Sequence, residues 1–213
     1  MFITFEGIDF CGKSTQVELL KEYLLKQNKK VHIIREPGGT EISEKIRDIL
    51  LDKKNNAMVN ETEIFLFSAS RSQLVREVIR PHLGSGYFVI SDRFHDSSTA
   101  YQGYGRGLPL DAILKIHNLA IGNTIPDITF IIDIPTSVAF ERKRKKLHTD
   151  LDRIELSNNE FYEKVRVGYL ELATKEKRFR VLDGTEKIEI IHQKIINEIN
   201  LLEGTKQTWR NKK

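Results

Sequence analysis

The stretch that decides the fold is Gly7-Ile8-Asp9-Phe10-Cys11-Gly12-Lys13-Ser14, which fits G-x-x-x-x-G-K-[ST], the pattern of a phosphate-binding loop. An apolar run at residues 2–5 predicts a buried strand before it, and apolar residues at helical spacing predict a helix over 15–26. In this context the glycines let backbone amides turn inward around an anion, and the helix dipole adds to their attraction. We therefore expect a nucleoside triphosphate here, with Lys13 on its β- and γ-phosphates and Ser14 on Mg²⁺. The alternative is a plain strand-to-helix turn that happens to contain these residues.

Further apolar runs predict the rest of the sheet. They lie at 31–34, 87–90, 128–134 and 179–182, and most are continuous rather than alternating, which is typical of parallel strands covered on both faces. Helical patterns between the runs fit right-handed crossovers. Examples are the apolar face of Ile42, Ile46, Ile49 and Leu50, the segment 61–83, and the isoleucines 188, 191, 195 and 199. The prediction is a three-layer α/β fold with a five-stranded parallel sheet, one domain over 1–204, and a flexible basic tail over 205–213.

Composition narrows the class of protein. The 213 residues carry 34 Lys and Arg against 30 Asp and Glu, a net charge of +4 without a basic stripe, so we expect no nucleic-acid partner. The single cysteine excludes an internal disulfide and fits a reducing cytoplasm. The six histidines lack the spacing of zinc ligands, and no apolar run reaches membrane-spanning length, so we expect no zinc site and no membrane partner.

Ligands of parallel α/β sheets bind outside the carboxyl ends of the strands, so the residues that follow each run are the candidates for a site. Asp92 and Arg93 follow the run at 87–90 directly. There Asp92 can hold Mg²⁺ through water, and the Arg93 guanidinium can clamp phosphates bidentately. The alternative is that Asp92 is a helix N-cap and Arg93 is an exposed side chain.

A second group of residues suits a flat organic ligand. Phe67 and Arg71 lie four residues apart on one helical face, where they could stack on a base and bind its carbonyl edge. The residue types alone favour a core Phe67 and a surface Arg71. Tyr101 and Gln102 could line a small-molecule pocket, and Pro37 gives the loop 35–40 a rigid apolar face. The basic run 142–146 begins a candidate mobile lid over about 142–157, with a solvated helix end as its alternative.

These residues together resemble a known family. The blocks FEGID at 5–9, REPGGT at 35–40, FSASR at 67–71, DRF at 92–94, AYQG at 100–103 and LDRIE at 151–155 are similar to those of bacterial thymidylate kinases, in order from Met1 to about Leu202. The resemblance implies a phosphate-loop kinase that transfers the γ-phosphoryl group of ATP to dTMP, giving ADP and dTDP for dTTP synthesis. It also implies a homodimer formed through the helix at 65–74.

The resemblance implies a role for each matching position. The residues expected on ATP are Gly7, Ile8, Asp9, Phe10, Cys11, Gly12, Lys13, Ser14 and Thr15. Those expected on dTMP are Asp9, Pro37, Phe67, Arg71, Arg93, Ser98, Tyr101 and Gln102. Ser14 and Asp92 are expected on Mg²⁺, and Lys13, Arg93, Asp9 and Arg153 in catalysis.

The phosphate-binding loop departs from the family pattern. Position 10 is usually Gly, Ala or Arg and position 11 is small, whereas this chain has Phe10 and Cys11. Some members place an arginine within the loop, and this chain has none there. We therefore expect the catalytic cation from Arg153, helped by Arg142 or Arg144. His148 stands where related lids often carry arginine.

Three other functions remain as alternatives. A different nucleoside or nucleoside-monophosphate kinase is the nearest, with Asp9 as the general base if the acceptor is a neutral hydroxyl. A regulatory GTPase would normally carry an Asn-Lys-x-Asp block, which does not occur. A nucleic-acid-binding ATPase would rest mainly on the basic tail.

Overall fold

The computed structural model describes residues 1–145 and 151–210, and in them five parallel strands form one sheet in the order β2-β3-β1-β4-β5. The strands are β1 (Phe2–Glu6), β2 (Val31–Arg35), β3 (Phe88–Asp92), β4 (Ile128–Asp133) and β5 (Phe179–Asp183). In register, Phe2 of β1 lies beside Val89 of β3, and Ile3 lies beside Ile128 of β4. The predicted fold class and all five predicted strands are confirmed to within two residues at each end.

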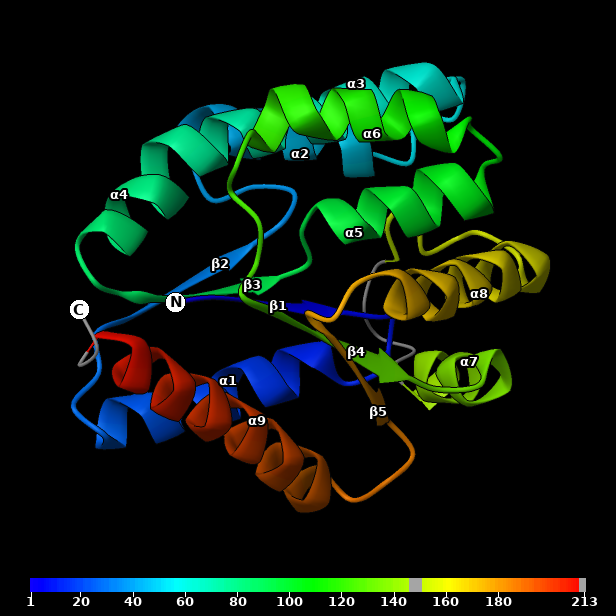
Figure 1. The fold of residues 1–213 in the computed structure, drawn as a ribbon. Coiled ribbons are helices and arrows are strands. Elements are labelled where there is room, and N and C mark those ends of the chain that lie inside the picture. The colour runs from blue at the N-terminus through cyan, green and yellow to red at the C-terminus, as the bar shows by residue number, and fades with distance from the viewer. Residues whose placement is uncertain (146–150, 211–213) are drawn as a thin grey trace.

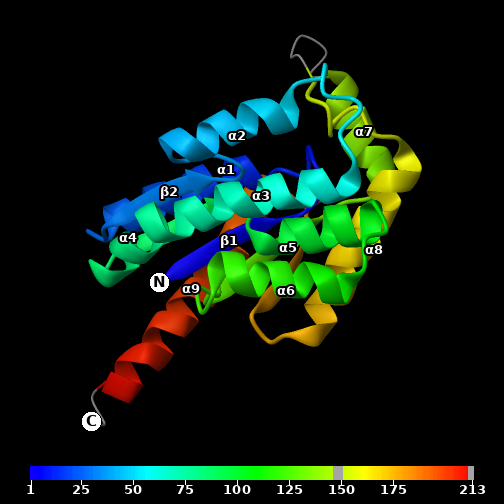
Figure 2. The ribbon, with the colours of Figure 1, turned by 90° about the horizontal axis from the view of Figure 1, so that it is seen from above.

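Helices cover both faces of the sheet (Figure 1). On one face lie α1 (Lys13–Lys26) and α9 (Ile188–Arg210), which pack against each other. The other face carries a longer set, seen from above in Figure 2. It comprises α2 (Glu41–Leu51), α3 (Asn60–Leu74), η1 (Val75–Ile79), α4 (Arg80–Gly84), α5 (His95–Ser98), η2 (Thr99–Gly105), α6 (Leu110–Ile121) and α8 (Asn159–Lys175). Because β1 is central, every one of its residues is buried.

Two further observations concern α2 and the end of the chain. The apolar face predicted for α2 is largely open to solvent: Ile42 is 51% exposed and Ile49 is 48% exposed, while Leu50 is fully buried. The reason is that α2 packs mainly on α3, which covers only one side of it. Residues 205–210, predicted as part of a flexible tail, continue α9, which ends at Arg210. The flexibility of the tail stays a prediction.

The predicted lid is divided between described and undescribed residues. Its first part ends helix α7 (Thr136–Lys145), and residues 151–157 form turns before α8. Residues 146–150, which include His148, lie outside the described part of the chain, so the lid stays a prediction. Among the helices of the described residues, none combines the length and apolarity that a bilayer crossing requires.

Candidate active site

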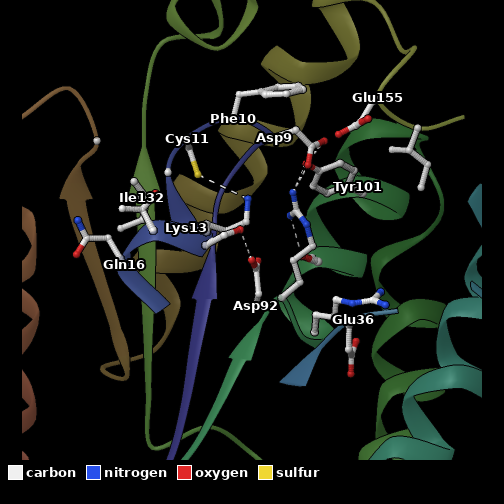
Figure 3. A pocket seen from close by; sticks show the side chains of 18 of the residues that line it. Asp9, Phe10, Cys11, Lys13, Gln16, Glu36, Asp92, Tyr101, Ile132 and Glu155 are labelled. Carbon is white, nitrogen blue, oxygen red and sulfur yellow. Dashed lines mark hydrogen bonds and ion pairs between the residues drawn. The ribbon is translucent and has the colours of Figure 1, made fainter. Parts of the chain in front are cut away.

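The loop between β1 and α1 encloses the ammonium group of Lys13 (Figure 3). Lys13 Nζ donates to the carbonyl oxygens of Gly7 at 3.1 Å and Ile8 at 3.0 Å, and lies 3.6 Å from Cys11 Sγ. Gly7 has φ +134°, and a Cβ there would meet the Ile132 carbonyl oxygen at 2.5 Å, so only glycine fits. The loop opens into a cavity of about 720 Å³, within the range that holds small ligands.

Ser14 and Asp92 meet at the floor of this cavity. Ser14 follows the loop, Asp92 ends the neighbouring strand β3, and Ser14 Oγ donates to Asp92 Oδ2 at 2.7 Å. Hydroxyl and carboxylate oxygens are ligands that a hard divalent cation accepts, so this pair fits Mg²⁺. In the described parts of the chain, no group of three or more His, Cys, Asp or Glu could hold a metal by itself. A magnesium ion at this pair would therefore complete its shell with phosphate oxygens and water.

Arg93 lies between the loop and a layer of hydroxyl groups. One terminal nitrogen, Nη1, donates to Gly7 O at 2.9 Å, Tyr169 Oη at 3.1 Å and Ser97 Oγ at 3.2 Å. The other, Nη2, donates to Asp9 Oδ1 at 2.5 Å and Tyr101 Oη at 3.0 Å. Arg93 has φ +72°, a conformation that costs a residue with a Cβ about 1–3 kcal/mol and is most frequent at functional sites.

Asp9 is held in its ionised form. Besides Arg93, its carboxylate accepts from Tyr162 Oη at 2.9 Å and Tyr101 Oη at 3.1 Å. Burial alone would raise the pKa of Asp9, but the nearby charges of Arg93 and Lys13 and the hydrogen bonds hold that pKa below its ordinary value. The carboxylate is therefore an anchor for Arg93 and a weak base.

The cavity is also lined by the residues predicted for a flat ligand. Pro37, Phe67, Ser98, Tyr101 and Gln102 all line it. Arg71 lies behind this lining and is only 1% exposed, so the alternative of a surface arginine is wrong. It donates through Nε to Glu36 Oε2 at 2.7 Å and through Nη2 to Ser98 Oγ at 3.1 Å, whereas Nη1 has no hydrogen-bond partner among the described residues.

Comparisons with known proteins identify the family. A family model described as thymidylate kinase matches residues 5–195. The chain belongs to the thymidylate kinase family. It is similar to the thymidylate kinase of Thermosipho africanus, with 51% identity over 92% of this chain and 95% of that protein, and to that of Kosmotoga olearia, with 48% identity over 94% and 96%. A crystal structure of thymidylate kinase from Ehrlichia chaffeensis matches 94% of this chain and 98% of its own, with a TM-score of 0.75 and 36% identity. The chain is thus an ATP-dependent nucleoside monophosphate kinase.

The arginines expected to supply the catalytic cation lie in different places in this family member. Arg142 lines the cavity at the phosphate-binding loop, where it donates to the carbonyl oxygens of Phe10 at 3.3 Å, Cys11 at 3.1 Å and Gly184 at 2.9 Å. Arg153 does not line the cavity, because its Nη2 lies 2.6 Å from Glu63 Oε2. Arg144 is exposed and also lies outside the lining. Of the three, the structure brings only Arg142 to the loop.

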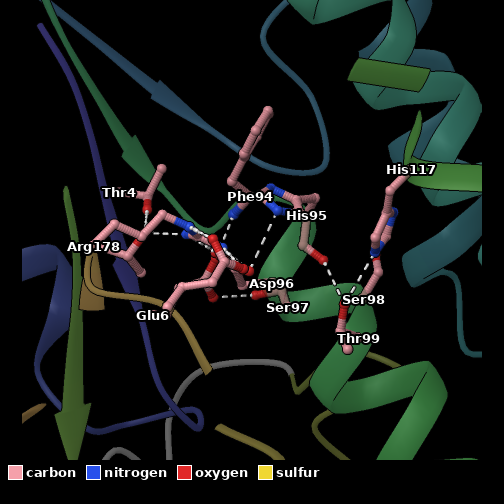
Figure 4. A network of polar contacts seen from close by, with 12 residues as sticks. Thr4, Glu6, Phe94, His95, Asp96, Ser97, Ser98, Thr99, His117 and Arg178 are labelled. Atoms are coloured by element: carbon pink, nitrogen blue, oxygen red, sulfur yellow. Dashed lines mark hydrogen bonds and ion pairs between the residues drawn. The ribbon is translucent and has the colours of Figure 1, made fainter. Parts of the chain in front are cut away.

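Several residues of the site were missed by the sequence analysis. Glu6, at the end of β1, accepts from Phe94 N at 2.8 Å and Ser97 Oγ at 2.6 Å (Figure 4), and it also accepts from Tyr169 Oη at 2.8 Å. Burial raises the pKa of Glu6 to about 7, and Asp96 nearby adds to the rise. Glu6 directly follows the first apolar run and so lies among the residues at the strand ends, but no role was predicted for it. Tyr162 and Tyr169, seven residues apart on α8, share one helical face, but their partners lie more than 70 residues away in sequence.

A buried ion pair supports the segment that carries Arg93. Arg178, just before β5, donates from Nη1 and Nη2 to the two carboxylate oxygens of Asp96 at 2.7 and 2.8 Å (Figure 4). His95 and His117 lie close by, with ring centroids 5.3 Å apart. Burial lowers the pKa of His95 to about 4 and that of His117 to about 2, so both rings are neutral near pH 7. The cluster thus ties α5, α6 and β5 together behind the cavity.

Proposed function

We propose that this enzyme transfers the γ-phosphoryl group of ATP to dTMP in the cavity described above. The observation that carries the proposal is that Lys13, Arg93 and the Ser14–Asp92 pair line one cavity of about 720 Å³ together with Phe67, Tyr101 and Gln102. The choice of ATP and dTMP as substrates is also supported by relatives at 48% and 51% identity, which are thymidylate kinases.

For the donor, we propose that residues 7–15 hold the ATP phosphates. The backbone amides of the loop and Thr15, together with Lys13, supply positive potential, and the α1 dipole points its positive end at the same place. Ser14 and Asp92 would hold Mg²⁺, which when bound neutralises charge on the β- and γ-phosphates. Arg142 adds a second cation beside the loop, and its position there favours it over Arg153 as a contact of the donor.

For the acceptor, we propose that Phe67 stacks on thymine, Pro37 packs against its methyl group, and Ser98 and Gln102 bind its polar edge. Among the residues that the structure describes, Arg71 Nη1 has no hydrogen-bond partner, so a base carbonyl is a suitable partner for this buried donor. Tyr101 would lie beneath the sugar. Arg93 and Asp9 would place the acceptor phosphate in line with the donor.

The state of Asp9 distinguishes a monophosphate acceptor from a neutral hydroxyl. A hydroxyl acceptor would need a general base, and a carboxylate whose pKa is lowered and whose oxygens already accept three hydrogen bonds is a poor one. An acceptor phosphate has a second pKa of about 6 and is already nucleophilic at pH 7. Catalysis then consists of alignment and charge neutralisation by Lys13, Arg93 and Arg142.

The decisive experiment measures ADP release from ATP with a panel of acceptors: dTMP, dUMP, UMP, AMP and thymidine. We expect dTMP to give the highest kcat/KM and thymidine to give no turnover. A preference for another acceptor would refute the proposal. Nucleotide hydrolysis without any acceptor would favour a GTPase-like switch instead.

We also propose that the enzyme is a homodimer. Large apolar side chains on α3 and α6, which pack side by side, are exposed: Phe65 is 60% exposed and Leu119 is 80% exposed. Such a patch is typical of an interface. Sedimentation of the purified chain and of Phe65→Asp tests the assembly, and an unchanged dimer mass in the variant would contradict this interface. A cytoplasmic location stays a prediction from the sequence.

A further inference from the structure

Glu63, in the first turn of α3, contacts two segments that line the cavity: η2, through Gln102, and the turn before α8, through Arg153. Its Oε1 accepts from Gln102 Nε2 at 2.8 Å and from Arg106 Nε at 3.2 Å, and its Oε2 lies 2.6 Å from Arg153 Nη2. The residue is only 1% exposed. Burial alone would raise the pKa of Glu63, but Arg106, Gln102 and Arg153 hold it below the ordinary value. The carboxylate is therefore ionised and bonded on both oxygens.

Arg153 is fixed on a second side by α2. Its Nε donates to the Leu50 carbonyl oxygen at 2.9 Å, and its backbone N–H donates to the Leu51 carbonyl oxygen at 3.2 Å. Arg153 is thus held at Nη2 by Glu63, at Nε by Leu50 and at its backbone N–H by Leu51, so it has little freedom to move. This geometry fixes the position of the turn that carries Arg153.

That turn contributes residues to the cavity. Asp152, Ile154 and Glu155 line it, while Arg153 between them points away toward Glu63. The turn is stiff, because Asp152 Oδ1 accepts from the backbone N–H groups of Ile154 and Glu155, each at 2.8 Å. A shift of Arg153 would therefore move these three lining residues together.

We infer that Glu63 is a positioning residue that couples the acceptor-binding amide of Gln102 to the cavity wall formed by residues 152–155, through Arg153. The inference rests on the proposed function, since it assigns Gln102 to the acceptor end. It also gives Arg153 a role different from that of a catalytic cation. The Arg153 guanidinium is ion-paired with Glu63, which Arg106 also contacts, and it lies outside the cavity lining.

The test is a double-mutant cycle on kcat and on the KM values for dTMP and ATP. Its variants are Glu63→Gln, which keeps the size and an acceptor for Gln102, Arg153→Ala, and the two combined. Arg180→Ala is the matched control. Arg180 also pairs with a glutamate, Glu198, at 2.6 Å and donates to backbone carbonyl oxygens, but it lies outside the cavity lining.

We expect each single change to raise the KM for dTMP about tenfold while the KM for ATP changes little. The double variant should resemble either single variant rather than show the product of the two effects. The control should match the unmodified enzyme. Arg153→Lys keeps the charge but loses the hydrogen bond to Leu50, so its KM for dTMP should lie between those of the unmodified enzyme and Arg153→Ala. If Glu63→Gln does not fold, the comparison of Arg153→Lys with Arg153→Ala tests the inference instead.

Three results would overturn the inference. One is a loss of kcat of about a thousandfold or more in Arg153→Ala, as expected of an arginine that touches the transferring phosphoryl group. Another is unchanged kinetics in Arg153→Ala, and the third is independent effects of the two substitutions. Failure of the proposed function is distinct, because the unmodified enzyme would then not phosphorylate dTMP at all.

Discussion

The buried carboxylate of Glu36 gives a prediction whose size follows from the structure. Its side chain is 3% exposed, and burial raises its pKa from 4.5 to about 7 even though Arg71 Nε lies 2.7 Å away. A difference of one in pKa corresponds to about 1.4 kcal/mol, so the rise is worth about 3 kcal/mol. Between pH 4.5 and 7 the folded chain keeps a proton that the unfolded chain has lost. The contribution of Glu36 to the free energy of unfolding is therefore greatest below pH 4.5, and it falls as the pH rises from 4.5 to about 7.

Glu36→Gln isolates this effect, because an amide keeps the shape and cannot titrate. We expect the free energy of unfolding of the unmodified protein, minus that of the variant, to fall by about 3 kcal/mol between pH 4.5 and 7 and to be level on either side. Urea unfolding at several pH values measures it. Glu198→Gln, which removes a carboxylate from the partly exposed pair with Arg180, is the control. A difference that rises with pH would refute the reasoning, since it would mean that Arg71 keeps Glu36 ionised in the folded state.

Three further changes test the donor end. Lys13→Ala should lower kcat/KM for ATP at least about a hundredfold with the fold intact by circular dichroism, and near-normal transfer would contradict the role of the loop. Asp92→Asn should raise the Mg²⁺ concentration for half-maximal activity about tenfold, and an unchanged Mg²⁺ titration would remove Asp92 from the metal site. Phe10→Gly should raise the free energy of unfolding by about 1 kcal/mol, because Phe10 has φ +65°. Phe10→Ala keeps a Cβ, so a gain there would point to a cause other than backbone strain.

The fold and the conformation of the phosphate-binding loop could be predicted because their signals are local. The phosphate-binding loop is a contiguous stretch between a strand and a helix, and the five strands are continuous apolar runs. The place of Asp92 beside Ser14 was predictable for a similar reason, since strand ends in a parallel sheet lie at one edge, while its role on Mg²⁺ stays a prediction. None of these predictions needed a contact between distant residues to be known.

The surroundings of Arg71 and Arg153 were less predictable because their partners are far apart in sequence. Arg71 was expected at the surface by residue type, but it is buried, and there Glu36, 35 residues earlier, and Ser98, 27 residues later, accept hydrogen bonds from it. Arg153 was assigned to catalysis from its motif, whereas Glu63, 90 residues earlier, holds it away from the cavity. A motif identifies a residue type and its position in the chain. The partner that determines where its side chain points becomes known only from the tertiary fold.

The cationic side chains near the cavity differ in whether neutral carbonyl oxygens or carboxylates accept hydrogen bonds from them. Within the described residues, Lys13 and Arg142 bond to backbone carbonyl oxygens, which are neutral, so their full positive charge remains available to a polyphosphate. Arg71 and Arg153 each lie against a buried carboxyl group, Glu36 and Glu63, and neither lines the cavity, so they act through position and hydrogen bonds rather than as cations on the phosphates. Arg93 combines both arrangements, since it bonds to Gly7 O and to Asp9. Substitution by a neutral donor should therefore be more harmful at Lys13 and Arg142 than at Arg153, because only the former pair neutralises phosphate charge.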